Sequence, residues 1–109
     1  MSRSTIRIGL FGFGVVGQGL HAVLSRTPGL RASIGRICVK DRHKARSLSP
    51  EHFTFDKNEL LTDDSLNVIV ELIDDADDAY RIVREALRRG NAVVTANKKM
   101  LAEHLPELI

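Results

Sequence analysis

The sequence predicts a single α/β domain in which helices cover a parallel sheet, and three observations support this. Short apolar segments that suit strands alternate with segments whose apolar residues recur every three or four positions, as on one face of a helix. A glycine-rich turn joins the first strand to the first helix. The length of 109 residues suits one domain. Because strands that alternate with helices are joined by crossovers, we expect them to pair in parallel.

The first strand is predicted at residues 6–12, an apolar run with one charge that is typical of a strand buried on both faces. A helix follows from Val16 and ends at the Pro-Gly pair of residues 28–29. The second strand is expected at residues 34–39. The basic, polar stretch of residues 40–50 then has the composition of a loop.

The second half of the chain continues this alternation. The elements expected in it are a short edge strand at 53–55, a helical turn at 58–64, a central strand at 67–73, a helix at 79–87, a strand at 92–95 and a final helix that Asn97 opens and Pro106 limits. Asp74 or Asp75 can cap the helix at 79–87, and Gly90 suits the left-handed turn at its end. The whole order predicts a doubly wound parallel sheet of the Rossmann type.

Composition and charge exclude several classes of protein. The chain is 43% hydrophobic and 28% charged, which fits neither a disordered nor a fibrous protein. The longest apolar run, residues 67–73, is too short to span a membrane and contains Glu71. The opening residues Met1 to Thr5 lead directly into the first strand, so we expect no signal peptide and a cytoplasmic location. A net charge of +2 gives no indication of nucleic-acid binding.

The residues that most often bind metals give no such pattern here. Cys38 is the only cysteine and lies in a predicted strand, which suits a core residue and excludes an internal disulfide. The four histidines lack the spacing of metal ligands and of a catalytic triad. The acidic run at residues 74–78 lacks the central glycine of a calcium loop, so helix capping is the better interpretation. No metal site is predicted.

The strongest functional pattern is the glycine loop between the first strand and the first helix. Its sequence is G-x-G-x-x-G, formed by Gly12, Phe13, Gly14, Val15, Val16 and Gly17. In such loops the first glycine allows the tight turn, the second lets the backbone approach a pyrophosphate, and the third lets the helix pack closely on the strand. The phosphates then lie at the positive end of the helix. The loop therefore predicts NADP or NAD as the cofactor.

The residue that distinguishes NADP from NAD is expected at the end of the second strand. Lys40, Asp41 and Arg42 are the candidates. A basic residue would accept the 2′-phosphate of NADP, whereas an acidic residue would hold the 2′-hydroxyl of NAD. Lys40, Arg42 and Lys44 favour NADP and Asp41 favours NAD, so the choice stays open.

A second motif, Val-Val-Thr-Ala-Asn-Lys, follows the strand at residues 92–95 and ends at Lys98. Together with Gly-Phe-Gly-Val-Val-Gly near the start and Val-Ile-Val-Glu-Leu-Ile in the middle, it resembles homoserine dehydrogenase over about residues 6–104. The resemblance implies NAD(P)-dependent interconversion of L-aspartate 4-semialdehyde and L-homoserine, on the pathway to threonine and methionine. Residues 1–109 then form the NAD(P)-binding domain.

The resemblance also implies roles for single residues. Phe13, Val15 and Val16 would face the pyrophosphate and the adjoining ribose through their backbone, and Lys40 would meet the 2′-phosphate. Thr95, Ala96 and Asn97 would lie near the nicotinamide. Lys98 would be the lysine beside nicotinamide and substrate, and is our candidate catalytic residue. It would stabilise charge on the aldehyde oxygen or pass a proton to it.

Two departures from the family pattern matter. Asp74 and Asp75 replace the usual glycine pair near the cofactor, and their charge would repel a pyrophosphate. The substrate-binding and dimerisation region of the family is absent from the chain, so we expect 109 residues alone to be inactive and the complete protein to be a homo-oligomer. Two alternatives remain: a domain of an L-aspartate dehydrogenase-like oxidoreductase, and a free-standing module that senses nucleotides without catalysis.

Overall fold

A computed structural model describes residues 5–109 of the chain. The opening residues Met1 to Ser4, on which the expectation of no signal peptide rests, lie outside this range. The elements in chain order are β1 (Ile6–Phe11), α1 (Val15–Ser25), β2 (Ala32–Cys38), β3 (Phe53–Thr54), α2 (Lys57–Leu61), β4 (Val68–Glu71), α3 (Ala76–Arg88), β5 (Ala92–Thr95) and α4 (Lys98–Leu108). Short 3₁₀ turns occupy Pro28–Leu30 and Pro50–His52.

The strands form one five-stranded sheet in the order β3-β2-β1-β4-β5. Every neighbouring pair is parallel. The strand order reverses between β1 and β4, so the carboxyl ends of these strands open a crevice where α/β sheets bind their ligands. The predicted doubly wound parallel sheet is therefore confirmed, and β3 is the expected short edge strand.

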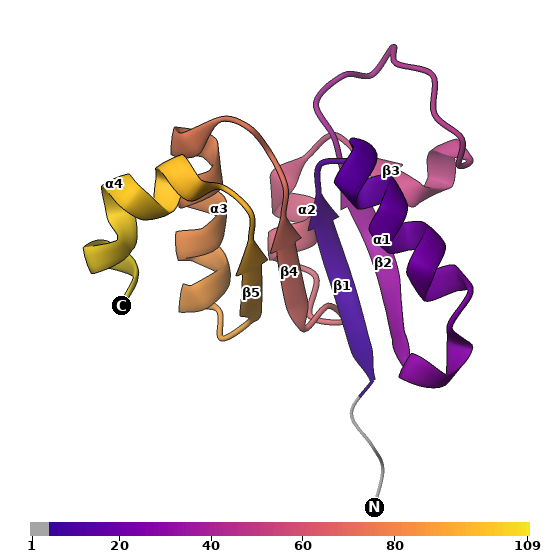
Figure 1. The fold of residues 1–109 in the computed structure, drawn as a ribbon, viewed down its shortest axis with the longest axis horizontal. Coiled ribbons are helices and arrows are strands. Elements are labelled where there is room, and N and C mark those ends of the chain that lie inside the picture. The colour runs from indigo at the N-terminus through magenta and orange to yellow at the C-terminus, as the bar shows by residue number, and fades with distance from the viewer. Residues whose placement is uncertain (1–4) are drawn as a thin grey trace, which may run out of the picture.

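Helices cover both faces of the sheet (Figure 1). On one face, α1 packs over a cluster built from buried side chains of β1, β2 and β4, among them Leu10, Ile37 and Val70. On the other face, α2 and α3 pack over Phe11, Cys38 and Ile69. Both layers are apolar because these strands are buried on both sides, as parallel strands usually are. The lone cysteine is a core residue, and burial raises the pKa of its thiol to about 11.

The final helix departs from its predicted end. Pro106 was expected to limit it, but α4 continues to Leu108 with the proline inside the helix. The prediction was wrong because a proline close to the carboxyl end removes only one backbone N–H donor, and the residues after it still adopt helical angles. Leu87, expected on the buried face of α3, is 41% exposed because it lies near the end of the helix. Within residues 5–109, no helix is long and apolar enough to cross a membrane.

Candidate functional site

The glycine loop leaves β1 at the opening of the crevice and is fixed by backbone hydrogen bonds. The N–H of Gly12 donates to the carbonyl of Cys38 at the end of β2, over 2.9 Å. On the other side, the N–H of Leu72 donates to the carbonyl of Phe11, also over 2.9 Å. The side-chain amide of Gln18 donates to the carbonyl of Phe13 at 3.2 Å. The loop is thus attached to both neighbouring strands and to α1.

The three glycines of the loop have different surroundings. Gly12 has a φ of 97°, which side-chain-bearing residues rarely adopt. A Cβ on Gly17 would lie 2.9 Å from the carbonyl oxygen of Gly12, so the helix meets the turn at a distance only glycine allows. A Cβ on Gly14 would meet nothing within 4 Å. Gly14 is therefore the position where the backbone faces open space.

The first turn of α1 presents unpaired backbone donors. Gly14 is the N-cap, and no side chain caps this end of the helix. The N–H groups of the first turn have no acceptor inside a helix, and they carry the positive end of its dipole. Val15 and Val16 are 89% and 66% exposed, so their side chains leave the helix end open. Phe13 differs, because its ring is buried and packs edge-on against Phe53.

A pocket of about 650 Å³ lies in front of this helix end. It is lined by the glycine loop, by the end of β2 with the basic residues after it, and by residues 72–75 between β4 and α3. Its volume lies within the range of about 300–1,000 Å³ that is usual for small-molecule sites. The uncapped helix end, the exposed backbone at Gly14 and the size of the pocket fit a dinucleotide whose pyrophosphate lies at α1.

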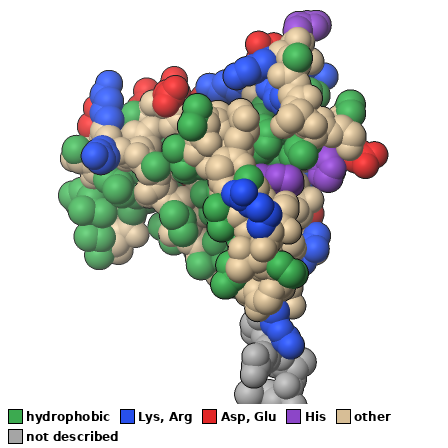
Figure 2. All heavy atoms as spheres, turned by 45° about the vertical axis from the view of Figure 1, so that its right-hand side comes forward, with side chains coloured by type: hydrophobic (Ala, Val, Ile, Leu, Met, Phe, Trp, Pro, Cys, Tyr) green, Lys and Arg blue, Asp and Glu red, His purple; other side chains and the backbone are tan. Residues whose placement is uncertain are grey.

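One end of the pocket is basic. Lys40, Lys44, Arg46 and Lys57 all line it, and Asp41 lies among them. Lys57 was not identified from the sequence, because it is the first residue of α2 and only tertiary packing brings it to the pocket. In the face shown in Figure 2, basic and acidic side chains lie close together along the upper edge. The pocket therefore offers an anion several cations but also nearby carboxylates.

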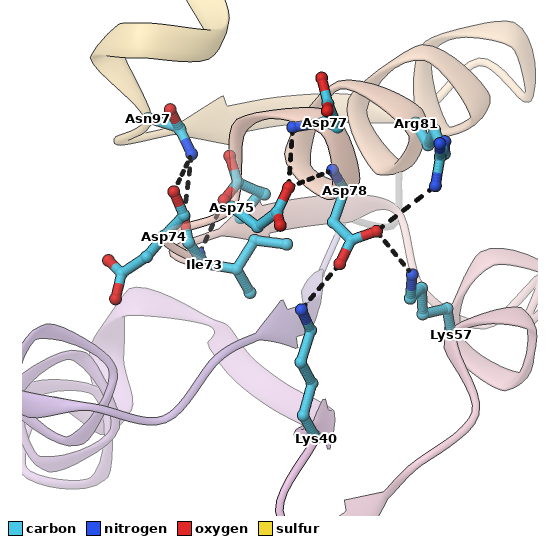
Figure 3. A network of polar contacts seen from close by, with 10 residues as sticks. Lys40, Lys57, Ile73, Asp74, Asp75, Asp77, Asp78, Arg81 and Asn97 are labelled. Carbon is cyan, nitrogen blue, oxygen red and sulfur yellow. Dashed lines mark hydrogen bonds and ion pairs between the residues drawn. The ribbon is translucent and has the colours of Figure 1, made fainter.

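Lys40 is held by Asp78 on α3 (Figure 3). Its ammonium nitrogen lies 2.7 Å from a carboxylate oxygen of Asp78. This hydrogen bond raises the pKa of Lys40 and lowers the pKa of Asp78, so both are charged at neutral pH. The side chain expected to meet a 2′-phosphate therefore already has an anionic partner from the protein.

The acidic residues that replace the family's glycine pair lie in the pocket lining, but one of them has a structural role. The carboxylate of Asp75 caps α3, accepting from the N–H groups of Asp77 at 2.9 Å and Asp78 at 3.1 Å. Its negative charge thus lies at the positive end of α3, the helix that it caps. Asp74 is exposed and lines both this pocket and the neighbouring one. Asp74 is therefore the carboxylate with more freedom to repel a bound phosphate.

A second, adjoining pocket of about 350 Å³ lies at the carboxyl end of β5. Ala96, Asn97 and Lys98 line it opposite Val16 of the glycine loop, so the two motifs found in the sequence meet here. Lys98 is exposed, and none of the carboxylates in residues 5–109 lies within ion-pair distance of it. Its ammonium group is available to a ligand in this pocket.

Thr95 and Asn97 have partners within the protein. The Thr95 hydroxyl donates to the carboxylate of Glu71, and the side-chain amide of Asn97 donates to the carbonyls of Ile73 at 3.0 Å and Asp74 at 3.3 Å. The side-chain oxygen of Asn97 accepts from the N–H of the third residue of α4, as an N-cap does. Both side chains hold the β5–α4 turn against the β4–α3 turn.

Glu71 is the buried group at the centre of this junction. It is fully buried at the end of β4, where its second carboxylate oxygen accepts from the N–H of Ile73 at 2.7 Å. The sequence showed an acid inside an apolar strand, which is the signal that could have marked Glu71 as part of the site. Its carboxylate connects the turns that frame the second pocket.

Comparison with known proteins places the chain in a family. A family model described as the NAD-binding domain of homoserine dehydrogenase matches residues 12–109. The chain belongs to this family. It is 38% identical to the homoserine dehydrogenase of Neisseria gonorrhoeae over 111 residues, which cover 94% of this chain and 26% of that protein. The family supports NAD(P) as the cofactor of the domain, as the glycine loop predicted.

Solved structures agree with this assignment. A crystal structure of Staphylococcus aureus homoserine dehydrogenase matches with a TM-score of 0.83 and 36% identity, over 97% of this chain and 30% of that one. The homoserine dehydrogenase of Thiobacillus denitrificans matches with a TM-score of 0.84 and 31% identity, over 96% of this chain and 26% of that one. The resemblance to homoserine dehydrogenase is thus confirmed. The chain spans about a quarter of the length of the curated relatives it matches.

Proposed function

We propose that this chain is the cofactor-binding domain of an enzyme that interconverts L-homoserine and L-aspartate 4-semialdehyde with NADP or NAD. The observation that carries the proposal is the uncapped end of α1, which faces a pocket at the carboxyl ends of the parallel strands. Family membership supports the same cofactor and the same activity for the complete protein. We further propose a cytoplasmic location and a role in threonine and methionine synthesis.

The residues of the first pocket would bind the cofactor by its phosphates. The backbone of the glycine loop from Gly12 to Gly17, with Phe13, Val15 and Val16 contributing only main-chain groups, would hold the pyrophosphate at the helix end. Lys40 would meet the adenosine ribose or its 2′-phosphate. The nicotinamide would then extend toward the second pocket, beside Thr95, Ala96, Asn97 and Lys98.

Lys98 is the proposed catalytic residue. The nicotinamide, when bound, donates or accepts the hydride. In the reducing direction the aldehyde carbon gains a hydride, and its oxygen gains negative charge that must be neutralised by a proton. The Lys98 ammonium would stabilise that charge and supply or relay the proton. In the oxidising direction Lys98 would have to act as the neutral amine, which would take the proton of the hydroxyl and become the ammonium group.

The substrate site is incomplete in this chain. By the family resemblance, further acid and lysine residues, substrate binding and assembly into a homo-oligomer belong to a region outside residues 1–109. We therefore propose that these residues bind the cofactor but do not turn over substrate alone. Small-molecule substrate would bind only with that region present.

Calorimetric titration of the chain with NADH and with NADPH tests cofactor binding directly. We expect at least one of them to bind, and failure of both would remove the proposed function. For catalysis, Lys98→Ala in the complete enzyme should lower kcat by about 100-fold or more while cofactor affinity changes little. The neighbouring Lys99→Ala is the matched control, since Lys99 does not line the second pocket. Binding without any turnover in the complete protein would favour the nucleotide-sensing alternative.

A further inference from the structure

The Asp78 carboxylate is the centre of an ion-pair cluster at the basic end of the pocket. Its oxygens lie 2.7 Å from the ammonium nitrogen of Lys40, 3.3 Å from that of Lys57 and 3.6 Å from a guanidinium nitrogen of Arg81. The three cations come from the loop after β2, the start of α2 and the next turn of α3 (Figure 3). The side chain of Asp78 is only 18% exposed, whereas its three cationic partners are 42–68% exposed, so their ammonium and guanidinium groups stay open to solvent and to a ligand.

Two of these cations also line the pocket. Lys40 and Lys57 belong to its lining. Lys40 lies just after β2, at the position where the adenosine ribose binds in doubly wound folds. The cluster therefore joins the ligand-facing lysines to a carboxylate carried by another element. Any anion that approaches these ammonium groups must share them with Asp78.

The competition between Asp78 and a bound anion for these ammonium groups affects NADP and NAD differently. NADP carries a 2′-phosphate with a charge of about −2, whereas NAD has an uncharged 2′-hydroxyl at that position. A nearby carboxylate repels the phosphate, and it occupies an N–H of Lys40 that the phosphate would use. It has no comparable effect on a hydroxyl. A residue that partly neutralises these lysines therefore changes selectivity more than overall affinity.

We propose that Asp78 is a specificity-determining residue. Its ion pairs with Lys40 and Lys57 weaken the binding of a 2′-phosphate and shift the cofactor preference from NADPH toward NADH. This inference rests on the proposed function, since it requires a dinucleotide in the pocket. Helix capping does not explain Asp78, because Asp75 already accepts the N–H groups at the start of α3 and the Asp78 carboxylate contacts only cations in residues 5–109.

The test compares Asp78→Asn with Asp77→Asn in the 109-residue chain. Both variants lose one negative charge in the first turn of α3, but Asp77 is exposed and lies near Glu103 and His104 rather than near the lysines. Dissociation constants for NADPH and NADH are measured by calorimetry at low and moderate salt. Adenosine 2′,5′-bisphosphate and ADP serve as shorter probes that lack the nicotinamide.

We expect Asp78→Asn to tighten NADPH and adenosine 2′,5′-bisphosphate by about tenfold, and NADH and ADP by less than twofold, with a gain that shrinks as salt increases. Asp77→Asn should leave the ratio of the two affinities unchanged. Adding Lys40→Met to Asp78→Asn should remove most of the gain if it acts through that ammonium.

Two other results have distinct meanings. If NADH binds and Asp78→Asn leaves the NADPH-to-NADH ratio unchanged or lowers it, the inference is wrong while the proposed function stands. If neither the wild-type chain nor either variant binds any of the four ligands, the proposed function fails and the inference with it.

Discussion

Replacing Gly14 by aspartate should stabilise the fold and destroy the cofactor site at the same time. Gly14 is the N-cap of α1 with φ −81° and ψ −156°, angles that any residue can adopt, and its Cβ would meet no atom within 4 Å. Aspartate caps a helix better than glycine by a few tenths of a kcal/mol, and loss of glycine's freedom in the unfolded chain adds ~0.4–1 kcal/mol. The free energy of unfolding should therefore increase by about 1 kcal/mol, which corresponds to a Tm increase of about 4 °C.

The same carboxylate would occupy the N–H groups proposed to bind the pyrophosphate and would repel its charges. A like-charge contact at a partly exposed site costs roughly 3 kcal/mol, so affinity for either dinucleotide should fall by more than 100-fold. Gly14→Asn is the matched control, because asparagine caps equally well without the charge and should lose less affinity. Thermal unfolding by circular dichroism and calorimetric titration measure the two effects. A lower Tm would refute the loop geometry, and unchanged binding would refute the phosphate site.

Three further changes test other parts of the structure. Gly17→Ala places a Cβ 2.9 Å from the Gly12 carbonyl oxygen and should cost about 2 kcal/mol by denaturant unfolding; an unchanged midpoint would contradict this close contact. Glu71→Leu removes the acceptor of the Ile73 N–H and of the Thr95 hydroxyl, so the free energy of unfolding should fall by about 1–3 kcal/mol; an unchanged denaturation midpoint would contradict these two hydrogen bonds. Because the folded state lowers the pKa of Asp78 and raises that of Lys40, their pair stabilises the fold between the two ordinary values, about pH 4 to 10, and is lost outside them. Asp78→Asn should thus be less stable by about 1 kcal/mol at pH 7, and this difference should disappear as the pH falls through the lowered pKa of Asp78.

The sequence was sufficient to predict the fold because its signals are local. Alternating strands and helices, the glycine loop and the cap of α3 all depend on residues close together in the chain. The elements occur in the predicted order, with some bounds shifted by two or three residues, and Asp75 is the cap of the two candidates. Pro106 was misjudged because a proline kinks or weakens a helix at the preceding turn without always ending it, and here the helix continues for two more residues.

The candidate site was predictable only where a motif marks it. Two motifs more than 75 residues apart in sequence meet at the second pocket, as parallel topology requires. The contacts among Lys40, Lys57 and Asp78 could not be foreseen, because they join three elements whose separation is set by tertiary packing. For the same reason, the sequence alone did not show that Thr95 and Asn97 are already bonded to neighbouring turns.

The hydrogen bonds that fix the glycine loop to β2, β4 and α1 also determine what ligand binding costs. The N–H groups of Gly12 and Leu72 form hydrogen bonds that fix the loop between its two neighbouring strands. The side chain of Gln18 on α1 donates a further hydrogen bond to the loop. The backbone donors are therefore in place before a ligand arrives, and little conformational entropy is lost on association. Binding at this end of the crevice should be limited by diffusion and desolvation, with no slow loop-ordering step in its kinetics.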